Sequence, residues 1–299
     1  MSKDHPIIAL TGSAGAGTTT FKVVFQKLFE RMNIKPAAVQ GDSFRAHDFE
    51  TWDKVFADYQ AKGIDVSHFG PEANEFEKLE ELFKNYSANG TGQFRQYICT
   101  HEPCTVSGAK KGGFTEYQDV PSDSDVLLYD GFHGGLVTTG MDKDLVGNNT
   151  IDVAAHVDLL IGVTPNMNLE WIQKIQRDVS ATGIDPEAVC DAILRRMPDY
   201  INYIIPQFSL TDINFQRVPV VDTSNPFIAR DIPNLDESMV ITRFRNPSQF
   251  DMSYLLSRIE GSFMSRPNTL VIPGREFECA LTMIFEPILE DMFEDKEMY

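Results

Sequence analysis

The sequence predicts an α/β fold in which a phosphate-binding loop joins the first strand to the first helix. An apolar run at residues 7–10 is followed by three glycines and then by an amphipathic helical pattern over 21–31. Further short apolar runs alternate with helical patterns along the chain, as in α/β proteins. The chain has 299 residues, of which 42% are hydrophobic, which is enough for one large domain. We therefore expect a single domain over residues 1–299, with an insertion at about 89–125.

The glycine-rich segment follows the spacing Gly12-x-x-x-x-Gly17-x-Thr19. Glycines allow backbone amides to face an anion, and the start of a helix adds partial positive charge. Thr19 stands where a hydroxyl would bind Mg²⁺, but Thr18 replaces the usual lysine, so another cation must reach the terminal phosphates. A purely structural turn is the alternative. The expected nucleotide-binding residues are Gly12, Ser13, Ala14, Gly15, Ala16, Gly17, Thr18 and Thr19.

Two acidic residues follow predicted strands. Asp42 comes just after a short strand at 37–40, and Asp130 ends the apolar run at 126–130. Ligands of open α/β sheets bind beyond the carboxyl ends of the strands. Asp42 is therefore a candidate general base for a substrate hydroxyl, and Asp130 a candidate Mg²⁺ ligand beside the phosphate loop. The alternative for Asp42 is a helix N-cap.

The remaining elements are read from periodicity and turn residues. Over 89–125 glycines and aromatic residues are interleaved without helical periodicity, which is typical of short antiparallel strands and loops. Such an insertion could cover a substrate site or form an interaction surface. Helices are predicted over 49–62, 72–86, 168–182, 186–203 and 276–293, and strands over 157–163, 216–222, 238–244 and 269–272.

The predicted helix at 168–182 carries Lys174, Arg177 and Asp178 at positions i, i+3 and i+4, so these side chains share one face. Two cations and an acid on one face could close over a triphosphate, and Lys174 could replace the lysine that the loop lacks. A solvated helix face with an internal salt bridge is the alternative. In the next helix, Arg195 and Arg196 suggest an anion or effector site, or a subunit contact.

Composition narrows the classes of function. The net charge of −18 and the pI of about 4.7 argue against a nucleic-acid-binding protein. An anionic substrate would need local clusters of arginine and lysine. The four cysteines lack zinc-site spacing and are expected to be reduced. The apolar run near residue 7 is too short for a signal peptide, and no run approaches the length of a membrane span, so we expect neither element. We expect a cytoplasmic protein without nucleic-acid or membrane partners.

Several segments resemble the bacterial branch of the phosphoribulokinase/uridine kinase family of P-loop kinases, and the likeness covers nearly the whole chain. The resemblance implies a mixed, mainly parallel sheet flanked by helices. It also implies transfer of the ATP γ-phosphoryl group, with Mg²⁺, to a hydroxyl of a sugar phosphate, by default D-ribulose 5-phosphate. The segments that carry it are HPIIALTGSAGAGTTT, GDSF, SHFGPEAN, NLEWIQKIQRD, PQFSLTDINFQRVPVVDTSNPFIAR and FRNPSQFD.

The resemblance also assigns roles to individual residues. The bacterial members lack the loop lysine too, and Lys174 matches the helix lysine that replaces it. Asp42 matches the catalytic base, Arg177 and Asp178 match a helix arginine and acid, and Asp130 stands where the family usually has glutamate. The family branch implies a homo-oligomer, typically an octamer, activated by NADH and inhibited by AMP. Basic residues that match those implicated in this control are Arg31, Arg195 and Arg196.

On the acceptor side the sequence departs from the family pattern. Arg45 and Cys99 occupy positions where the family usually has histidine, and Phe49 and Thr182 occupy positions where it has arginine. Arg45 can still hold a phosphate, since its guanidinium binds oxyanions through two donors. Three functions stay open: a ribulose 5-phosphate kinase, a kinase for another sugar phosphate or a nucleoside, and a non-catalytic nucleotide sensor.

Overall fold

The structure is a computed structural model that describes residues 4–12, 18–98, 110–139, 141, 150–183, 185–225 and 231–294. The expected loop residues 13–17 and Cys99 lie outside this part of the chain, as do the side chains of Arg177 and Thr182. The chain divides into two compact units, each made of three segments. The first comprises Met1–Thr11, Lys35–Leu160 and Ala192–Leu210, and the second Gly12–Ile34, Ile161–Asp191 and Thr211–Tyr299. The single domain expected over 1–299 stays a prediction.

The first unit is built on parallel strands in the order β2-β5-β1. They are β1 (Ile7–Gly12), β2 (Pro36–Gln40) and β5 (Val126–Gly131). Pro36 pairs with Val126, and Ile7 pairs with Leu127. Every residue of β1 is buried, as expected of a parallel strand that is covered on both faces.

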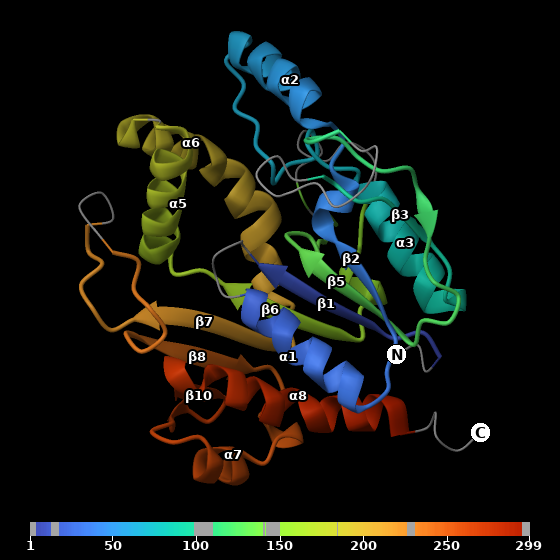
Figure 1. Ribbon diagram of the computed structural model, residues 1–299, viewed down its shortest axis with the longest axis vertical. Coiled ribbons are helices and arrows are strands. Elements are labelled where there is room, and N and C mark those ends of the chain that lie inside the picture. The colour runs from blue at the N-terminus through green and yellow to red at the C-terminus, as the bar shows by residue number, and fades with distance from the viewer. Residues whose placement is uncertain are drawn as a thin grey trace. The chain divides into compact units, whose positions relative to one another are not determined.

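Helices and a small second sheet complete the first unit. These elements are α2 (Phe49–Ala61), α3 (Phe76–Asn89) and the antiparallel pair β3 (Gln93–Phe94) and β4 (Gln118–Asp119). The pair confirms the short antiparallel strands predicted for the insertion, and Figure 1 shows β3 beside α3. α2 begins where the Asp48 carboxylate accepts a hydrogen bond from the Thr51 amide, and α3 ends at Gly90, which has a φ of 71°. The predicted start of α3 at residue 72 was four residues too early.

The second unit has strands in the order β6-β7-β8-β10-β9. β6 and β7 are parallel, whereas the later pairs are antiparallel, so the fold is mixed α/β. The first two residues of β6 belong to the first unit. The strands are β6 (Leu159–Thr164), β7 (Ile213–Pro219), β8 (Ser238–Phe244), β9 (Phe263–Arg266) and β10 (Thr269–Pro273).

The helices of the second unit include α1 (Thr18–Arg31) and α8 (Phe277–Phe293), which lie next to each other (Figure 1). Buried aromatic rings join the two helices. The Phe21 ring lies 5.0 Å from Phe215 and 5.6 Å from Phe277, measured between centroids. Arg31 pairs with Glu286 across the same two helices. Buried aromatic rings in edge-to-face contact thus hold the helix that follows the phosphate loop.

The other helices are α5 (Met167–Thr182), α6 (Pro186–Asp199) and α7 (Met252–Arg258). α6 passes at Ala192 into the first unit and continues as a π-helix, Tyr200–Ile204, and a 3₁₀ helix, Ile205–Ser209. No helix in the described ranges is both long and apolar enough to cross a membrane.

Candidate functional site

The expected phosphate loop is described at its two ends. At Gly12 an added Cβ would lie 2.4 Å from the Val163 carbonyl oxygen, so this position requires glycine. α1 begins at Thr18, and Thr19 is exposed in its first turn. That turn holds no acidic residue, so the positive end of the helix is not neutralised locally. This end of α1 suits an anionic ligand.

Asp42 lies in a 3₁₀ helix, Gly41–Phe44, directly after β2. The N-cap of this helix is Gln40, whose side chain makes no capping hydrogen bond. The Asp42 carboxylate instead accepts a hydrogen bond from Arg45, with the Nε–Oδ1 distance 2.9 Å, and one terminal guanidinium nitrogen is also 2.9 Å from Oδ1. Asp42 is therefore not the N-cap of this helix. Its role as the catalytic base stays a prediction.

Asp130 lies close to this turn in the sheet. It pairs in register with Leu10 of β1 and with Gln40 of β2, the residue two positions before Asp42. Its side chain is partly exposed at the carboxyl end of β5. The first unit therefore brings the two predicted acidic residues to the same edge of the sheet.

The Tyr129 side chain fills the space between Gly41 and Gly131, the glycines that adjoin Asp42 and Asp130 in sequence. A Cβ added at Gly41 would lie 2.7 Å from the Tyr129 hydroxyl oxygen, and one added at Gly131 would lie 2.5 Å from it. Tyr129 is fully buried, and burial raises the pKa of its hydroxyl, which therefore stays protonated. The glycines are required because the ring occupies the place of any larger side chain.

The insertion contributes two residues that sequence reasoning did not select. The guanidinium of Arg45 lies 4.4 Å from the centre of the Tyr97 ring, which is a cation–π distance. Arg95 donates hydrogen bonds to the backbone oxygens of Ser43 and Arg45, at 3.2 and 2.7 Å. The interleaved aromatic residues predicted short strands here, but nothing in the sequence pointed to these contacts.

A buried polar network fixes the segment after β5. The Gln207 side chain accepts from the Thr11 hydroxyl and from the Gly135 amide, each at 2.9 Å, and donates to the Phe132 carbonyl at 2.8 Å. His133 lies 2.9 Å from the carbonyl oxygen of Phe69 through Nε2. Burial lowers the pKa of His133 to about 4, so the imidazole is neutral and Nε2–H donates to this carbonyl. This network supports the DGFHG segment that begins with Asp130.

In the second unit, Lys174 and Asp178 of α5 form an ion pair. Their side chains are only 16% and 24% exposed, so the internal salt bridge proposed as the alternative exists but lies on a half-buried face. Of the three predicted effector residues, Arg31 pairs with Glu286, while Arg195 and Arg196 are half-buried on α6. The catalytic and effector roles stay predictions.

No group of three or more His, Cys, Asp or Glu side chains in the described residues could form a metal site by itself. Mg²⁺ in kinases is held by one or two protein ligands together with phosphate oxygens and water. Asp130 of the first unit is partly exposed and Thr19 of the second unit is exposed, and each has an oxygen of the kind that binds Mg²⁺.

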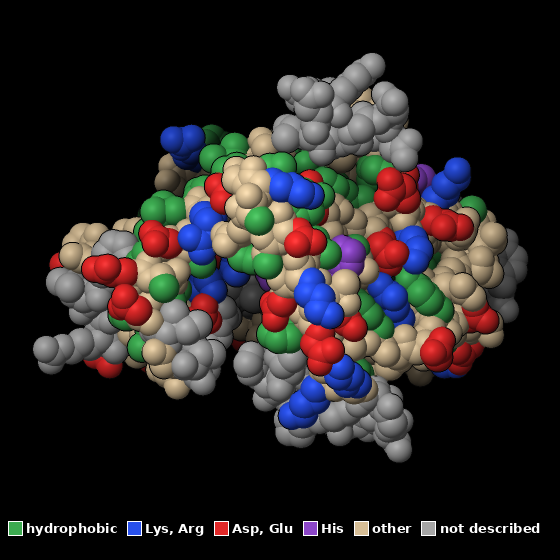
Figure 2. Space-filling view, turned by 90° about the horizontal axis from the view of Figure 1, so that it is seen from above, with side chains coloured by type: hydrophobic (Ala, Val, Ile, Leu, Met, Phe, Trp, Pro, Cys, Tyr) green, Lys and Arg blue, Asp and Glu red, His purple; other side chains and the backbone are tan. Residues whose placement is uncertain are grey.

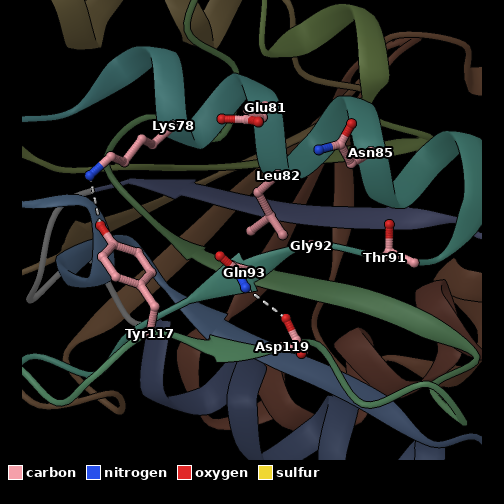
Figure 3. A pocket seen from close by; sticks show the side chains of 9 residues that line it. All are labelled: Lys78, Glu81, Leu82, Asn85, Thr91, Gly92, Gln93, Tyr117 and Asp119. Carbon is pink, nitrogen blue, oxygen red and sulfur yellow. Dashed lines mark hydrogen bonds between the residues drawn. The ribbon is translucent and has the colours of Figure 1, made fainter.

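A groove of about 520 Å³ lies between α3 and the β3–β4 pair (Figure 3). Its polar lining is partly paired within the protein, since Gln93 donates to Asp119 at 2.8 Å and Lys78 to the Tyr117 hydroxyl at 3.0 Å. None of its lining residues was predicted as a site residue. On the face in Figure 2, acidic and basic side chains are interspersed, without a continuous basic stripe among the described residues.

Comparison with known proteins places these residues in a family. The family model described as "Phosphoribulokinase / Uridine kinase family" matches residues 7–224. Phosphoribulokinase from Sinorhizobium medicae is 49% identical over 296 residues, and the chromosomal phosphoribulokinase of Cupriavidus necator is 49% identical over 298 residues, each covering 99% of both chains. The solved structure of phosphoribulokinase from Rhodobacter spheroides is 44% identical, covers 99% of this chain and 100% of its own, and has a TM-score of 0.88. The chain belongs to the phosphoribulokinase/uridine kinase family of kinases.

Proposed function

We propose that this chain is a phosphoribulokinase, which transfers the γ-phosphoryl group of ATP to a hydroxyl of D-ribulose 5-phosphate. The observation that carries the proposal is similarity over the whole length. Proteins named phosphoribulokinase are 49% identical over 99% of both chains, and a solved phosphoribulokinase has the same fold over 99% of this chain. The partly exposed pair of Asp42 and Arg45 at the carboxyl end of β2 supports it further.

On the acceptor side, Asp42 accepts the proton of the attacking hydroxyl, and Arg45 binds the phosphate of the sugar. The phosphate and the C1 hydroxyl lie at opposite ends of a five-carbon chain, so Arg45 must leave Asp42 to reach the phosphate. Binding of a phosphorylated acceptor then frees the oxygen Oδ1, which the guanidinium occupies in the structure. The base becomes available only when the correct class of acceptor is bound.

On the nucleotide side, the backbone amides of residues 12–19 bind the phosphates of ATP. Lys174 and Arg177 neutralise charge on the transferring group, and Asp178 keeps Lys174 in place through their ion pair. Thr19 and Asp130 would hold Mg²⁺, which supplies further charge neutralisation at the phosphates when bound.

An ATP-consumption screen against ribulose 5-phosphate, other pentose and hexose phosphates, and uridine tests the proposal, with products identified by mass. Ribulose 5-phosphate should give the highest kcat/KM and yield ribulose 1,5-bisphosphate. If another acceptor is clearly preferred, the chain is a kinase of the same family that acts on a different substrate, which is the second candidate function. Phe49, which stands where the family usually has an arginine for the sugar phosphate, favours that candidate. ATP binding without transfer to any acceptor would identify a nucleotide sensor.

The family branch further supports an octamer that NADH activates and AMP inhibits, with Arg31, Arg195 and Arg196 as the effector residues. Light scattering measures the mass of the assembly. Assays with each nucleotide, on the unmodified chain and on an Arg195→Ala variant, test the control. Identical activity with and without both nucleotides would refute it.

A further inference from the structure

Arg95 of the insertion joins the Gly41–Arg45 turn to the start of α3. Its Nε donates to the Ser43 carbonyl at 3.2 Å, and one terminal nitrogen donates to the Arg45 carbonyl at 2.7 Å and to the Glu75 carboxylate at 3.1 Å. The Arg95 side chain is only 15% exposed. One side chain thus binds two backbone oxygens of the turn that carries Asp42 and Arg45.

Two aromatic rings of the insertion fix the plane of this guanidinium. Its central carbon lies 3.7 Å from the centre of the Phe114 ring and 5.0 Å from that of Tyr117. Cation–π contacts of this kind hold arginine in one orientation, so its donors stay directed at the turn. A lysine could reach one of these oxygens, but it lacks the fixed planar fork that binds both.

The turn also has backbone ties to the segment before α3. The Glu75 amide donates to the Phe44 carbonyl at 2.8 Å, and the Ala46 amide donates to the Ala73 carbonyl at 2.9 Å. Arg95 binds the carbonyls of the residues on either side of Phe44, which are Ser43 and Arg45. Two residues along the chain, Tyr97 contacts the Arg45 guanidinium at 4.4 Å. The insertion therefore holds the backbone of the turn through Arg95 and the side chain of Arg45 through Tyr97.

We propose that Arg95 is a positioning residue for the sugar-phosphate acceptor. It fixes the backbone at Ser43 and Arg45, so that Asp42 faces the hydroxyl and Arg45 stays within reach of the phosphate. This inference rests on the proposed function, because it assigns Asp42 and Arg45 to the acceptor. Arg95 acts through these residues and leaves the nucleotide side unaffected.

Lys78 offers a matched control. It pairs with the same Glu75 at 2.7 Å, and its amine lies 5.0 Å from the centre of the same Tyr117 ring. Figure 3 shows Lys78 reaching the Tyr117 hydroxyl at one end of the groove. Among the described residues, no hydrogen bond or ion pair joins Lys78 to the Gly41–Arg45 turn. Lys78→Met therefore disturbs the shared partners, while Arg95→Met also removes the ties to the turn.

Steady-state kinetics with ATP and ribulose 5-phosphate varied separately tests the inference. Arg95→Met should raise the KM for ribulose 5-phosphate by about tenfold or more, since small displacements of positioning groups are costly, and change the KM for ATP by less than about twofold. Lys78→Met should leave both values within about twofold of the unmodified chain. An unchanged acceptor KM in Arg95→Met, or an equal rise in Lys78→Met, would overturn the proposal. If Arg95→Met does not fold, Arg95→Lys is judged by the same criteria.

A second readout separates this inference from the proposed function. Amide hydrogen exchange over residues 42–46 should be faster in Arg95→Met than in Lys78→Met, because only the first variant loses contacts to this turn. Equal exchange in the two variants would refute the positioning role whatever the substrate is. If the unmodified chain does not phosphorylate ribulose 5-phosphate but exchange over the turn differs as expected, the proposed function fails and the role of Arg95 in fixing the turn stands.

Discussion

The guanidinium of Arg45 and the carboxylate of Asp42 form an ion pair at 2.9 Å, in which two nitrogens approach the same oxygen, Oδ1. The two residues are three positions apart in one short turn, and neither side chain is fully buried. In the resting protein the proposed base is thus held by the proposed phosphate-binding residue. An acceptor must separate the two before Oδ1 can take a proton.

Replacing Asp42 by asparagine removes the proposed base with little change in size. We expect kcat to fall by about 10²- to 10⁴-fold, the usual contribution of a general base, while the KM for ATP changes little. Steady-state kinetics and ATP binding by calorimetry measure the two effects.

Asp48 provides a control six residues further on. Its carboxylate accepts a hydrogen bond from the Thr51 amide at 2.7 Å and caps α2, a role that asparagine fills about equally well. Asp48→Asn should therefore keep near-normal turnover. Normal turnover in Asp42→Asn would disprove the assignment of the base.

Replacing Arg45 by glutamine should reduce the preference for a phosphorylated sugar. A hydrogen bond to a charged group contributes about 1.5–3 kcal/mol, so the ratio of kcat/KM for ribulose 5-phosphate over ribulose should fall by about 10- to 150-fold. Most of this change should come from a weaker reaction with ribulose 5-phosphate.

Phosphite gives a second test of Arg45, because it can bind the guanidinium without being part of the sugar. Added phosphite should speed the phosphorylation of ribulose by the unmodified chain, since it draws Arg45 away from Asp42, and should have no effect on Arg45→Gln. The role given to Arg45 would be contradicted if the unmodified chain and Arg45→Gln had the same preference for ribulose 5-phosphate over ribulose. Equal activation of the two proteins by phosphite would contradict it too.

Sequence reasoning found the part of the candidate site that depends on strand ends. It placed Asp42 and Asp130 at the carboxyl ends of two strands, and the structure shows in addition that these strands are neighbours, with Gln40 opposite Asp130. It succeeded because parallel strands are continuous apolar runs whose ends are easy to recognise. The α/β class and α5 followed from the same periodicity, whereas the mixed character of the sheet was implied by the family resemblance.

The parts that were missed depend on contacts between distant segments. Arg95 is an isolated cation in a region without periodicity, and its role comes from the carbonyls of Ser43 and Arg45, some fifty residues earlier. The strand predicted at 216–222 was shifted by three residues, because β7 ends at Pro219 and the apolar pair Val220 and Val221 is 63% and 41% exposed. Local hydrophobicity could not show that this pair lies outside the sheet.

Replacing Lys174 by methionine should lower kcat by about 10²- to 10³-fold, the cost of removing one donor that stabilises developing charge. If Lys174 served only the helix through Asp178, the effect would be confined to stability, because removing one partner of a half-buried ion pair leaves the other charge uncompensated. Thermal unfolding and kinetics distinguish the two roles. Lys27→Met is the control, because Lys27 of α1 forms a surface ion pair with Glu278 and is 65% exposed. A normal ATP-dependent rate in Lys174→Met would assign charge neutralisation to a different cation.

His133 should make the protein less stable in weak acid. Its pKa is lowered by burial to about 4, whereas in the unfolded chain it is about 6.5. Between these values the unfolded chain binds a proton that the folded protein does not, so the free energy of unfolding falls as the pH decreases from about 6.5 toward 4. Between pH 7 and pH 5 the contribution of His133 is about 2 kcal/mol.

His133→Gln isolates this contribution, because the amide can still donate to the Phe69 carbonyl but does not titrate. Urea unfolding at pH 7 and pH 5 should show that the unmodified chain loses about 2 kcal/mol more than the variant over this interval. The variant is expected to be less stable at pH 7, since an amide fills the space of the ring imperfectly, so only the difference between the two pH values counts. Equal losses in the two proteins would mean that His133 is protonated in the folded state, and the hydrogen bond to Phe69 would then have to be a charged one.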